Sequence, residues 1–367
     1  MYHATPLHYW NQTVCAGGML DIHAIDPNCP TWTKLHTLSP DKTTIQLTIP
    51  AAATCWAAGA DLLFTSEDTA HDHAIGTIAS TNPTTGTITL TTPLDQRKTS
   101  VADGYGAILA VEVALLTRTF KIQPDDITTL IGGHVIVYHT PTVHQHIEGV
   151  ELYSMGQQGN LGRYPIHFHM SEDCNGSIVR KNLVRKSNQR CYVAHGTHNI
   201  TFEENVAFDT FGHCYMTEDG AEWHNMFRNN LGAYTRKPAT LIRPKESDNF
   251  CSTLWITQPS THHIGNVAAG SESSGFWLEV KMRMPGAGLP INAGVKTKHL
   301  ALGSFVNNTS HSNWLNGFAF YPTGYKPREE VVLENLVAFK NTGTGVFFHS
   351  SENIKIDGGY FDDNRYK

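Results

Sequence analysis

The fold is decided by residues 182–231, which read NLVRKSNQRCYVAHGTHNITFEENVAFDTFGHCYMTEDGAEWHNMFRNNL. An asparagine followed by Leu or Val recurs in this stretch at Asn182, Asn205 and Asn230, at intervals of 23 and 25 residues. No helical periodicity interrupts the pattern. A period in the low twenties, with short strands and turn-forming Asn and Gly, is typical of one coil of a parallel β-helix.

The same repeat continues toward the C-terminus. The asparagine returns at Asn266 and Asn335, with a variant at Asn307-Asn308, and the interval of 36 before Asn266 indicates an inserted loop. A second short strand begins eight to eleven residues after most of these positions. We expect the asparagines to occupy one bend of successive coils and to stack through their amides. The alternative is an ordinary turn-to-strand junction that happens to recur.

The first third of the chain follows a different pattern. In 43–49 (TTIQLTI) and 86–93 (GTITLTTP), β-branched residues alternate with aliphatic ones between turn residues, as in half-buried strands. The sequence therefore predicts an all-β protein with a parallel β-helix over 121–367, including inserted loops, and a smaller β-rich region over 1–120.

Composition excludes some classes of function. The 27 Lys and Arg residues against 33 Asp and Glu residues give a net charge of −6, and no basic run suits nucleic acid. The apolar stretches around 51–64 and 107–116 are too short to span a bilayer, and residues 1–10 do not resemble a signal peptide. Protonation of all 21 histidines would bring the charge to +15, so at acidic pH the protein would attract a polyanion.

The cysteines and the glycosylation sequons favour a secreted protein. There are seven cysteines, an odd number, and Cys15 and Cys29 are near enough in sequence to close a small loop. The sequons permit glycosylation in a secretory compartment. They lie at Asn11, Asn175, Asn199, Asn307 and Asn308.

Alignment of consecutive coils puts metal-binding residue types above one another. Setting the strand at 164–169 over those that begin 26 and then a further 23 residues later aligns His169, His195 and Glu218. His167 shares their face because side chains alternate along a strand. Imidazole and carboxylate ligands together suit zinc or a similar divalent ion. The alternative is that these histidines fill the coil interior or form an ordinary hydrogen-bonded ladder.

The acidic stretch that follows is the densest in catalytic residue types. Glu218, Asp219 and Glu222 lie within five residues, beside His213 and opposite Arg190. Paired carboxylates can divide into a protonated acid and an ionised base, as glycosidic bond cleavage requires. The alternative is that Asp219 merely forms a turn with Gly220 and that Glu222 is solvated.

Other candidate groups are less distinctive. Trp277, Trp314 and Tyr321 suit sugar-stacking platforms, although large aromatic residues more often pack in a core. His311 would face the same groove from a later coil. A local cluster in the first third suits either a second metal site or the tip of a polar hairpin. It consists of Asp68, His71, Asp72 and His73.

Several motifs resemble those of the cell-migration-inducing and transmembrane hyaluronidases and their microbial relatives. The motifs are GRYPIHFH at 162–169, NQRC at 188–191, GHCY at 212–215, EDG at 218–220 and the segment 266–277. Residues 40–122 look like the latter part of the glycine-rich β domain that precedes the β-helix in that family. The resemblance implies a right-handed parallel β-helix, an extracellular setting and endo-type depolymerisation of hyaluronan or a related polysaccharide, with divalent-ion dependence.

These observations together predict a secreted polysaccharide-depolymerising enzyme whose substrate is an acidic polymer such as hyaluronan. The expected metal ligands for an ion of zinc or calcium type are His167, His169 and His195. The expected catalytic residues are Asp219, His213 and Glu218, the last also a candidate fourth ligand. The expected substrate contacts are Arg190, through a substrate carboxylate, and Trp277, Glu222 and His311. The alternatives are a lyase acting on uronate-containing glycans and a non-catalytic glycan-binding or adhesion module.

Overall fold

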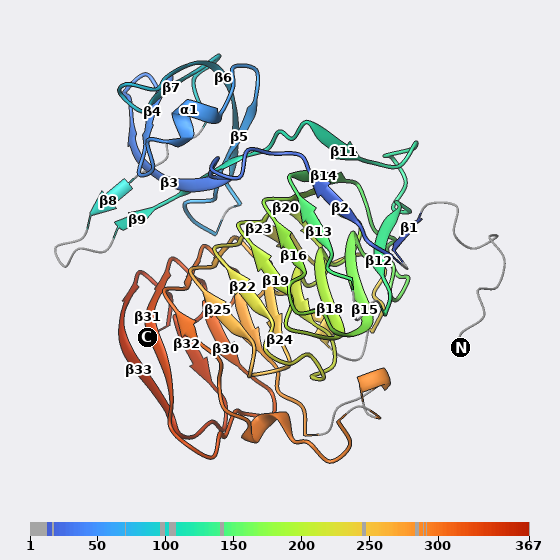
Figure 1. The fold of residues 1–367 in the computed structure, drawn as a ribbon. Helices are drawn as coiled ribbons and strands as arrows, with labels where there is room; N and C mark the ends of the chain where they lie inside the picture. The colour runs from blue at the N-terminus through green and yellow to red at the C-terminus, as the bar shows by residue number, and fades with distance from the viewer. Residues whose placement is uncertain are drawn as a thin grey trace.

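A computed structural model describes residues 13–366 except 17, 70, 96–99, 103–107, 140–142, 244–246, 283–285, 289 and 291. Figure 1 shows a small barrel, in blue, beside a long stack of parallel strands that runs from green to red. The expected all-β fold, a parallel β-helix preceded by a smaller β domain, is confirmed. Within the described residues the helices are short: α1 (Ala52–Cys55), η1 (Ser247–Asn249), η2 (Gly286–Gly288) and η3 (Thr297–His299).

The first sheet of the β-helix carries the histidine motifs. It joins one strand from each coil, and every neighbouring pair is parallel. Its strands, in spatial order, are β1 (Thr13–Ala16), β12 (His134–Val137), β15 (Ile166–Asp173), β18 (Tyr192–His198), β21 (Tyr215–Thr217), β24 (Leu254–Ile256), β27 (Phe276–Leu278), β30 (Phe318–Phe320) and β32 (Val346–Phe348).

The second and third sheets form the other two faces and meet in one long strand, β31 (Val331–Phe339), with which β33 (Ile354–Asp362) pairs. The second sheet contains β11 (Phe120–Ile122), β14 (Val150–Tyr153), β17 (Leu183–Arg185), β20 (Val206–Phe211), β23 (Leu231–Arg236), β26 (Val267–Ala269) and β29 (Thr309–His311). The third sheet contains β2 (Asp21–His23), β13 (His146–Glu148), β16 (Ile178–Arg180), β19 (Thr201–Glu203), β22 (Met226–Arg228), β25 (His262–Ile264) and β28 (Phe305–Val306).

Stacked side chains fill the interior of the β-helix. Tyr192 lies flat against Tyr215 on the next coil with ring centroids 4.8 Å apart, and Phe202 lies on Phe227 at 4.9 Å. All four are buried in the main hydrophobic core. Because neighbouring strands lie about 4.8 Å apart, equivalent residues of successive coils make contact and fix the register of the sheets.

The expected asparagine ladder is present. Each ladder side chain donates from Nδ2 to Oδ1 of the asparagine one coil further on, at 3.0–3.2 Å, through Asn182, Asn205, Asn230, Asn266 and Asn308. Asn335 does not belong to it. Its Nδ2 donates to Oδ1 of Asn307 instead. Asn307 and Asn335 both have a positive φ, as do the residues that immediately precede the ladder asparagines. Asparagine tolerates that left-handed conformation, which explains the Asn-Asn variant.

The barrel lies against the second sheet. Its strands close in the order β10 (Glu112–Leu115), β3 (Trp32–Leu38), β4 (Thr44–Leu47), β7 (Thr87–Leu90), β6 (Ala74–Asn82) and β5 (Asp61–Phe64), and β8 (Ser100–Ala102) pairs with β9 (Ile108–Ala110) outside it. Leu63 and Ala114 of the barrel pack in one buried cluster with Phe208, Leu231 and Val267 of the β-helix. Apolar contact thus joins the two parts.

The first two strands of the chain belong to the β-helix. β1 pairs with β12 in the first sheet, and β2 pairs with β13 in the third. The barrel is therefore inserted between two segments of the β-helix stack. The division of the chain at residue 120 stays a prediction. Residues 13–16 and 21–23, although they precede residue 120, pair with strands of the β-helix.

The cysteines pair differently from the expected loop. Cys29 is bonded to Cys55, so the pairing of Cys29 with Cys15 is wrong. Cys191 is bonded to Cys214 on the neighbouring coil, and Cys174 is a buried free thiol, as is Cys251. Among the sequons, Asn11 lies outside the described residues, and Asn308 is buried in the ladder. No helix among the described residues combines the length and apolar character needed to cross a bilayer.

Candidate functional site

The register of the first sheet brings the predicted histidines together. His169 of β15 lies directly opposite His195 of β18. The pairing of β18 with β21 places Glu218 on the next coil, where its N–H donates to the carbonyl of Ala194 at 3.1 Å. Phe168 points into the core, so His167 and His169 on either side of it point outward. The predicted column is confirmed.

The three imidazoles present their nitrogens to one point. One nitrogen from each of His167, His169 and His195 lies within 4.8 Å of the others. The Nδ1 atoms of His169 and His195 are 3.2 Å apart. Two nitrogens bound to one tetrahedral zinc ion would be about 3.3 Å apart, given zinc–nitrogen bonds of about 2.0–2.1 Å. The spacing of the donors therefore suits a single divalent ion.

Hydrogen bonds on the far side of two rings orient them for this purpose. Nδ1 of His167 donates to the carbonyl of Gly162 at 2.9 Å, and its Nε2 is buried without a hydrogen-bond partner. Nε2 of His195 lies 3.3 Å from Oδ2 of Asp219. A bond from the outer ring nitrogen to a carbonyl or carboxylate is the usual support of a metal-bound histidine, because it fixes the tautomer. The buried, partnerless Nε2 shows that the donors fit a metal ion.

The electrostatic environment favours a cation at the cluster. Burial and the other two histidines hold the pKa of His167 well below its ordinary value, and burial lowers the pKa of His169. Burial also acts to lower the pKa of His195, but the bond to Asp219 and the charges of Glu218 and Glu222 outweigh it and raise the pKa to about 9. The negative charge that attracts this proton would equally attract a metal ion.

Glu218 contributes a free carboxylate oxygen to the cluster. Its Oε2 is buried without a hydrogen-bond partner and lies 3.7 Å from Nδ1 of His195 and 3.9 Å from Nε2 of His167. Its Oε1 accepts a hydrogen bond from the hydroxyl of Tyr164 at 3.3 Å. Glu218 is therefore anchored by one oxygen and presents the other to the histidines.

Arg190 supports this arrangement from behind, and its predicted role as a substrate contact is wrong. The guanidinium is 1% exposed, donates to the Tyr164 hydroxyl at 2.7 Å and to Asp248 at 2.8 Å, and lies 3.7 Å from Oε1 of Glu218. A buried cation that is already paired with carboxylates cannot reach a polymer at the surface. Arg190 positions Tyr164 and Glu218.

Glu222 is also misassigned as a substrate contact. It is fully buried, and its carboxylate accepts hydrogen bonds from the N–H groups of Gly196 at 2.9 Å and Gly220 at 2.8 Å. Burial and the neighbouring Asp219 raise its pKa to about 8. Glu222 therefore fastens the acidic turn to β18.

Asp219 is held from two directions. Its Oδ2 faces His195 and also accepts the N–H of Gly288, in η2, at 2.8 Å, while Oδ1 is buried without a hydrogen-bond partner. Burial acts to raise the pKa of Asp219, but the bond to His195 and its charge prevail and lower it. Asp219 is therefore an ionised support of His195.

His213 lies outside the cluster, and its predicted acid/base role is wrong. The ring is fully buried, stacks on Trp255 with centroids 4.6 Å apart, and accepts the N–H of Ser252 at Nδ1. Burial lowers its pKa to about 3. A neutral imidazole sealed behind Trp255 has no route to a substrate, so His213 is part of the packing.

His311 is likewise buried, so the prediction that it binds substrate is wrong. It projects from the second sheet toward the barrel, where its Nε2 lies 2.9 Å from Oε2 of Glu112. Both side chains are 0% exposed. The barrel covers this face, which the sequence of the β-helix alone does not reveal.

Trp277 lies on the same sheet as the histidines, further along the stack. It lines a pocket of about 230 Å³ with Phe250, Tyr321 and Phe347, and its indole N–H donates to the carbonyl of Tyr321 at 2.6 Å. The pocket shares no residue with the histidine cluster, so a sugar contact at Trp277 stays a prediction. Trp314 instead donates to the carbonyl of Thr69 in the barrel.

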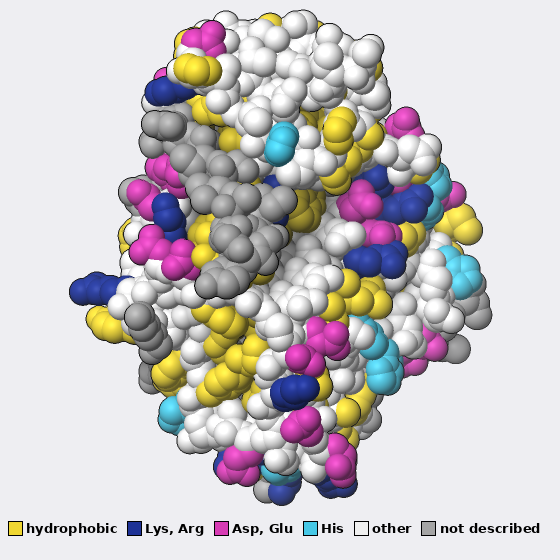
Figure 2. Space-filling view, turned by 90° about the vertical axis from the view of Figure 1, so that its left-hand side faces the viewer, with side chains coloured by type: hydrophobic (Ala, Val, Ile, Leu, Met, Phe, Trp, Pro, Cys, Tyr) yellow, Lys and Arg dark blue, Asp and Glu magenta, His cyan; other side chains and the backbone are white. Residues whose placement is uncertain are grey.

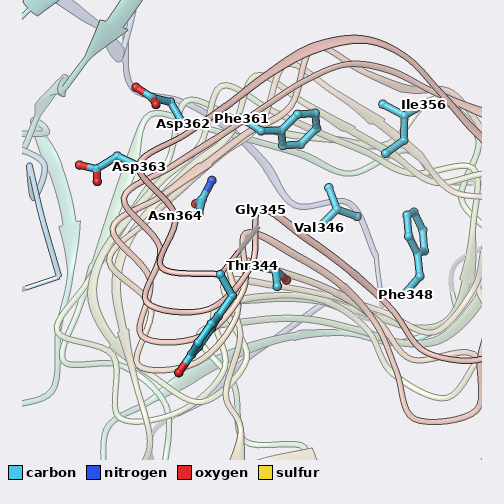
Figure 3. Close-up of a pocket in the computed structure, with 10 residues that line it drawn as sticks. Thr344, Gly345, Val346, Phe348, Ile356, Phe361, Asp362, Asp363 and Asn364 are labelled. Atoms are coloured by element: carbon cyan, nitrogen blue, oxygen red, sulfur yellow. The ribbon is translucent and has the colours of Figure 1, made fainter.

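A larger cavity lies at the C-terminal end of the stack. Figure 3 shows Val346, Phe348, Ile356 and Phe361 around this space of about 520 Å³, with Asp362 at its edge. Apolar side chains also gather on the lower part of the face shown in Figure 2. The cavity has no histidine and lacks the donor set of the first sheet.

The cluster in the first third of the chain serves the contact between barrel and β-helix. His71 packs against Tyr234 and Trp314 with ring centroids 4.8 Å away in each case, and His73 packs against Tyr234 at 4.9 Å. Asp72 accepts the N–H of Glu67 and closes the turn. These contacts support the hairpin interpretation, and the groups of metal-ligand type within the described residues do not include this cluster.

Sequence reasoning missed two members of the site. Tyr164 follows GR in the GRYPIHFH motif, and no residue-type rule distinguishes it from a core tyrosine. Asp248 lies 58 residues after Arg190, in the loop between β23 and β24, and nothing local marks it as the partner. Only the three-dimensional structure brings the two together.

The fold and site define a class: a parallel β-helix protein with a histidine and carboxylate cluster, of the composition of a metal centre, on the outer side of one sheet. Residues 130–318 match the model of the CEMIP beta-helix, and the chain belongs to this family.

Individual relatives are similar over much of this chain. It is 29% identical over 332 residues to the Homo sapiens cell surface hyaluronidase CEMIP2, covering 71% of this chain and 24% of the relative. It is 27% identical to the Mus musculus cell migration-inducing and hyaluronan-binding protein, with the same coverages, and 31% identical to Mus musculus fibrocystin-L, covering 83% of this chain and 8% of the relative. This chain thus spans a quarter or less of each.

Among solved structures, a tailspike of Pseudomonas phage phi297 shows 10% identity and a TM-score of 0.17 over 95% of this chain and 61% of the tailspike. These values are too low to support any argument.

Proposed function

We propose that this chain is a hyaluronidase-like, endo-acting glycoside hydrolase that depends on a divalent metal ion and acts on hyaluronan or a related acidic polysaccharide. The observation that carries the proposal is the convergence of His167, His169 and His195 beside the free oxygen of Glu218. The names of the human and mouse relatives support the choice of hyaluronan. The histidines would hold the ion, with Glu218 as a candidate fourth ligand.

The proposed chemistry assigns separate tasks to the ion and the side chains. A divalent ion in this position supplies positive charge that polarises a sugar oxygen or neutralises a uronate carboxylate. Asp219 holds the tautomer of His195 that leaves Nδ1 free. Gly162 does the same for Nε2 of His167. Both supports are in place before substrate arrives, so no reorganisation is required at the moment of reaction.

Glu218, the candidate fourth ligand, is also the proposed proton-transfer group. Its Oε2 has no hydrogen-bond partner and lies 3.7 Å from Nδ1 of His195. Tyr164 and Arg190 hold the other oxygen, which fixes the direction in which Oε2 points. Glycosidic bond cleavage needs such a group beside the scissile oxygen.

A secreted, extracellular setting fits the proposed substrate. The disulfides Cys29–Cys55 and Cys191–Cys214 form in an oxidising compartment. Acidic polysaccharides of the extracellular matrix are accessible there, and the metal ion would offset the repulsion from a chain whose net charge is −6.

The proposal is tested with the full chain and high-molecular-weight hyaluronan. Polymer length is followed by size-exclusion chromatography with and without chelator, and bound metal is measured on the same samples. His169→Ala is expected to lose both the ion and the depolymerisation. The matched control is His36→Ala, at an exposed position in the barrel, which should retain both. Normal turnover by His169→Ala would refute the metal-dependent mechanism.

The alternatives give different readouts in the same assay. A lyase would shorten the polymer and add ultraviolet absorbance from unsaturated ends, whereas a hydrolase adds none. A glycan-binding or adhesion module would bind hyaluronan and leave its length unchanged. Either result would overturn the hydrolase assignment.

A further inference from the structure

A second polar cluster lies on the third sheet, at its N-terminal end. β2 pairs with β13 so that Asp21 lies opposite His146 and His23 opposite Glu148. The residues between them, Ile22 and Ile147, face the hydrophobic core. The four polar side chains therefore project together from the outer side of the third sheet, which is a different sheet from the one that carries the other histidines.

The contacts inside this cluster converge on one carboxylate oxygen. Oε2 of Glu148 lies 3.0 Å from Nε2 of His146 and 3.3 Å from Nδ1 of His23. The two imidazole rings are adjacent, with centroids 3.9 Å apart. Both nitrogen–oxygen separations are close to the edge of a tetrahedron around one zinc ion, which is about 3.3 Å long for bonds of about 2.0–2.1 Å. Asp21, His23 and His146 also each offer a ligand atom within 4.8 Å of the others.

Asp21 supplies the outer support that a metal-bound histidine requires. Its Oδ1 lies 2.7 Å from Nε2 of His23, the ring nitrogen that does not face Glu148. A carboxylate on the outer nitrogen fixes the tautomer that leaves the inner nitrogen free to bind metal. Asp21, His23 and the shared oxygen of Glu148 are therefore arranged as they would be in a carboxylate–histidine–metal site.

We propose that His23, His146 and Glu148 form a second divalent-metal site, of zinc type, with Asp21 orienting His23. The ligand set is two imidazoles and one carboxylate, which zinc accepts readily. Glu148 is only 2% exposed at its side chain, whereas His23 and Asp21 are about half exposed, so an ion can reach the site from solvent.

Arg180 shapes the site rather than occupying it. Its Nε lies 2.8 Å from Oε1 of Glu148, and its Nη2 donates to Oε2 at 3.1 Å. This pairing with Arg180, which lies on the next coil, fixes the plane of the Glu148 carboxylate. Oε2 retains a lone pair toward the two histidines, because a carboxylate oxygen accepts more than one interaction.

The role of the site follows from the position of β2. This strand has three residues and ends the third sheet, so among the described residues its backbone pairs with β13 alone. Such a short terminal strand gains little from its own hydrogen bonds. An ion shared between His23 of β2 and two residues of β13 would fasten the strand to the stack, so we assign the site a structural role.

The test counts ions per chain. Purified protein is loaded with excess zinc, passed through a desalting column and analysed by mass spectrometry of metals. Two zinc ions per chain are expected for the wild type and one each for His146→Ala and His169→Ala. The double variant should bind none, and the control His36→Ala should bind two.

The outcomes separate this site from the proposed active site. One ion that is lost in His169→Ala and kept in His146→Ala overturns the second site and leaves the proposed function intact. One ion lost only in His146→Ala upholds the second site and removes the proposed catalytic metal. Glu148→Gln, which keeps side-chain shape, should also lose one ion, so misfolding of His146→Ala cannot decide the result.

Hydrogen exchange supplies a readout at β2 itself. With zinc, amides of residues 21–23 are expected to exchange at least tenfold more slowly than with chelator, and the difference should vanish in His146→Ala. Equal exchange with and without zinc in the wild type would contradict the structural role.

Discussion

Asp219 and His195 are joined by a contact of 3.3 Å between Oδ2 and Nε2, and this contact leaves Nδ1 of His195 facing Nδ1 of His169. The two residues come from consecutive coils of the first sheet. The carboxylates of the acidic turn at 218–222 therefore have different roles, which the composition of the turn does not indicate. Asp219 orients the imidazole of His195, and Glu218 presents an oxygen without a hydrogen-bond partner.

Asp219→Asn should weaken metal binding without unfolding the protein. The amide keeps the shape of the side chain but lets Nε2 of His195 lose its proton, so that Nδ1 becomes protonated and unavailable. Loss of such a support typically costs about 10–100-fold in metal affinity. Calorimetric titration with zinc measures the change, and Asp362→Asn, at an exposed position of β33, is the control. Unchanged affinity would show that Asp219 does not support His195.

Arg190→Lys should destabilise the protein and lower kcat. Lysine cannot serve Tyr164 and Asp248 together, and breaking a buried ion pair typically costs about 3–5 kcal/mol. Urea unfolding gives the stability, and the kinetics of hyaluronan cleavage give kcat and KM. A rise in KM alone, at unchanged stability, would restore the substrate contact predicted from sequence. Arg365→Lys, at an exposed position, should change neither.

Asn230→Ala should reduce the free energy of unfolding by at least about 3 kcal/mol, because several buried partners lose hydrogen bonds at once. Asn230 donates to Asn266 and to the carbonyl of Phe202 and accepts from Asn205, all near 3.0 Å.

The matched control for the ladder is Asn335→Gly. Asn335 is exposed, makes one side-chain bond and has a φ of 50°, which glycine adopts without strain. Its replacement should cost less than about 1 kcal/mol in urea unfolding. Equal costs at Asn230 and Asn335 would contradict a stabilising ladder.

Glu112→Gln should destabilise the contact between barrel and β-helix in a pH-dependent manner. Burial acts to raise the pKa of Glu112, but the charge and hydrogen bond of His311 prevail, so the pKa is lowered below its ordinary value of 4.5. Because the ionised form is favoured in the folded state, its contribution is present above pH 4.5 and is lost as pH falls through the folded-state pKa.

Urea unfolding of wild type and Glu112→Gln at pH 7 and at lower pH tests this linkage. The difference in stability is expected to be about 3 kcal/mol at pH 7 and to shrink below pH 4.5. Glu352→Gln, which removes a surface pair with Lys326, should cost less than about 1 kcal/mol. A difference that grows on acidification would contradict the assignment.

The sequence predicts the β-helix and its register well because both depend on local, repeated features. The 26- and 23-residue offsets that align His169, His195 and Glu218 are the offsets of the actual strand pairing. Alternation along β15 then places His167 outward. The Asn ladder fails only at Asn335, where the left-handed bend residue is also an asparagine.

The burial of outward-facing residues could not be predicted in this way. Alternation says that a side chain leaves the coil interior, but not what covers it afterwards. His311 faces Glu112 of the barrel, 199 residues away in sequence, and Arg190 meets Asp248 of a loop. The pairing of β2 with β13, which assembles the second cluster, could not be predicted either. The asparagine repeat that sets the register begins near residue 182 and does not extend to these strands.

The two long insertions lie at opposite ends of first-sheet strands: one precedes β24, between β23 and β24, and the other follows β27, between β27 and β28. Each sends one group back toward the histidines: Asp248 reaches Arg190, and Gly288 reaches Asp219. Neither loop contributes a histidine to the cluster, yet each is bonded to a residue that supports it. A change in the length or sequence of either loop would therefore be transmitted to the histidines through Arg190 or Asp219.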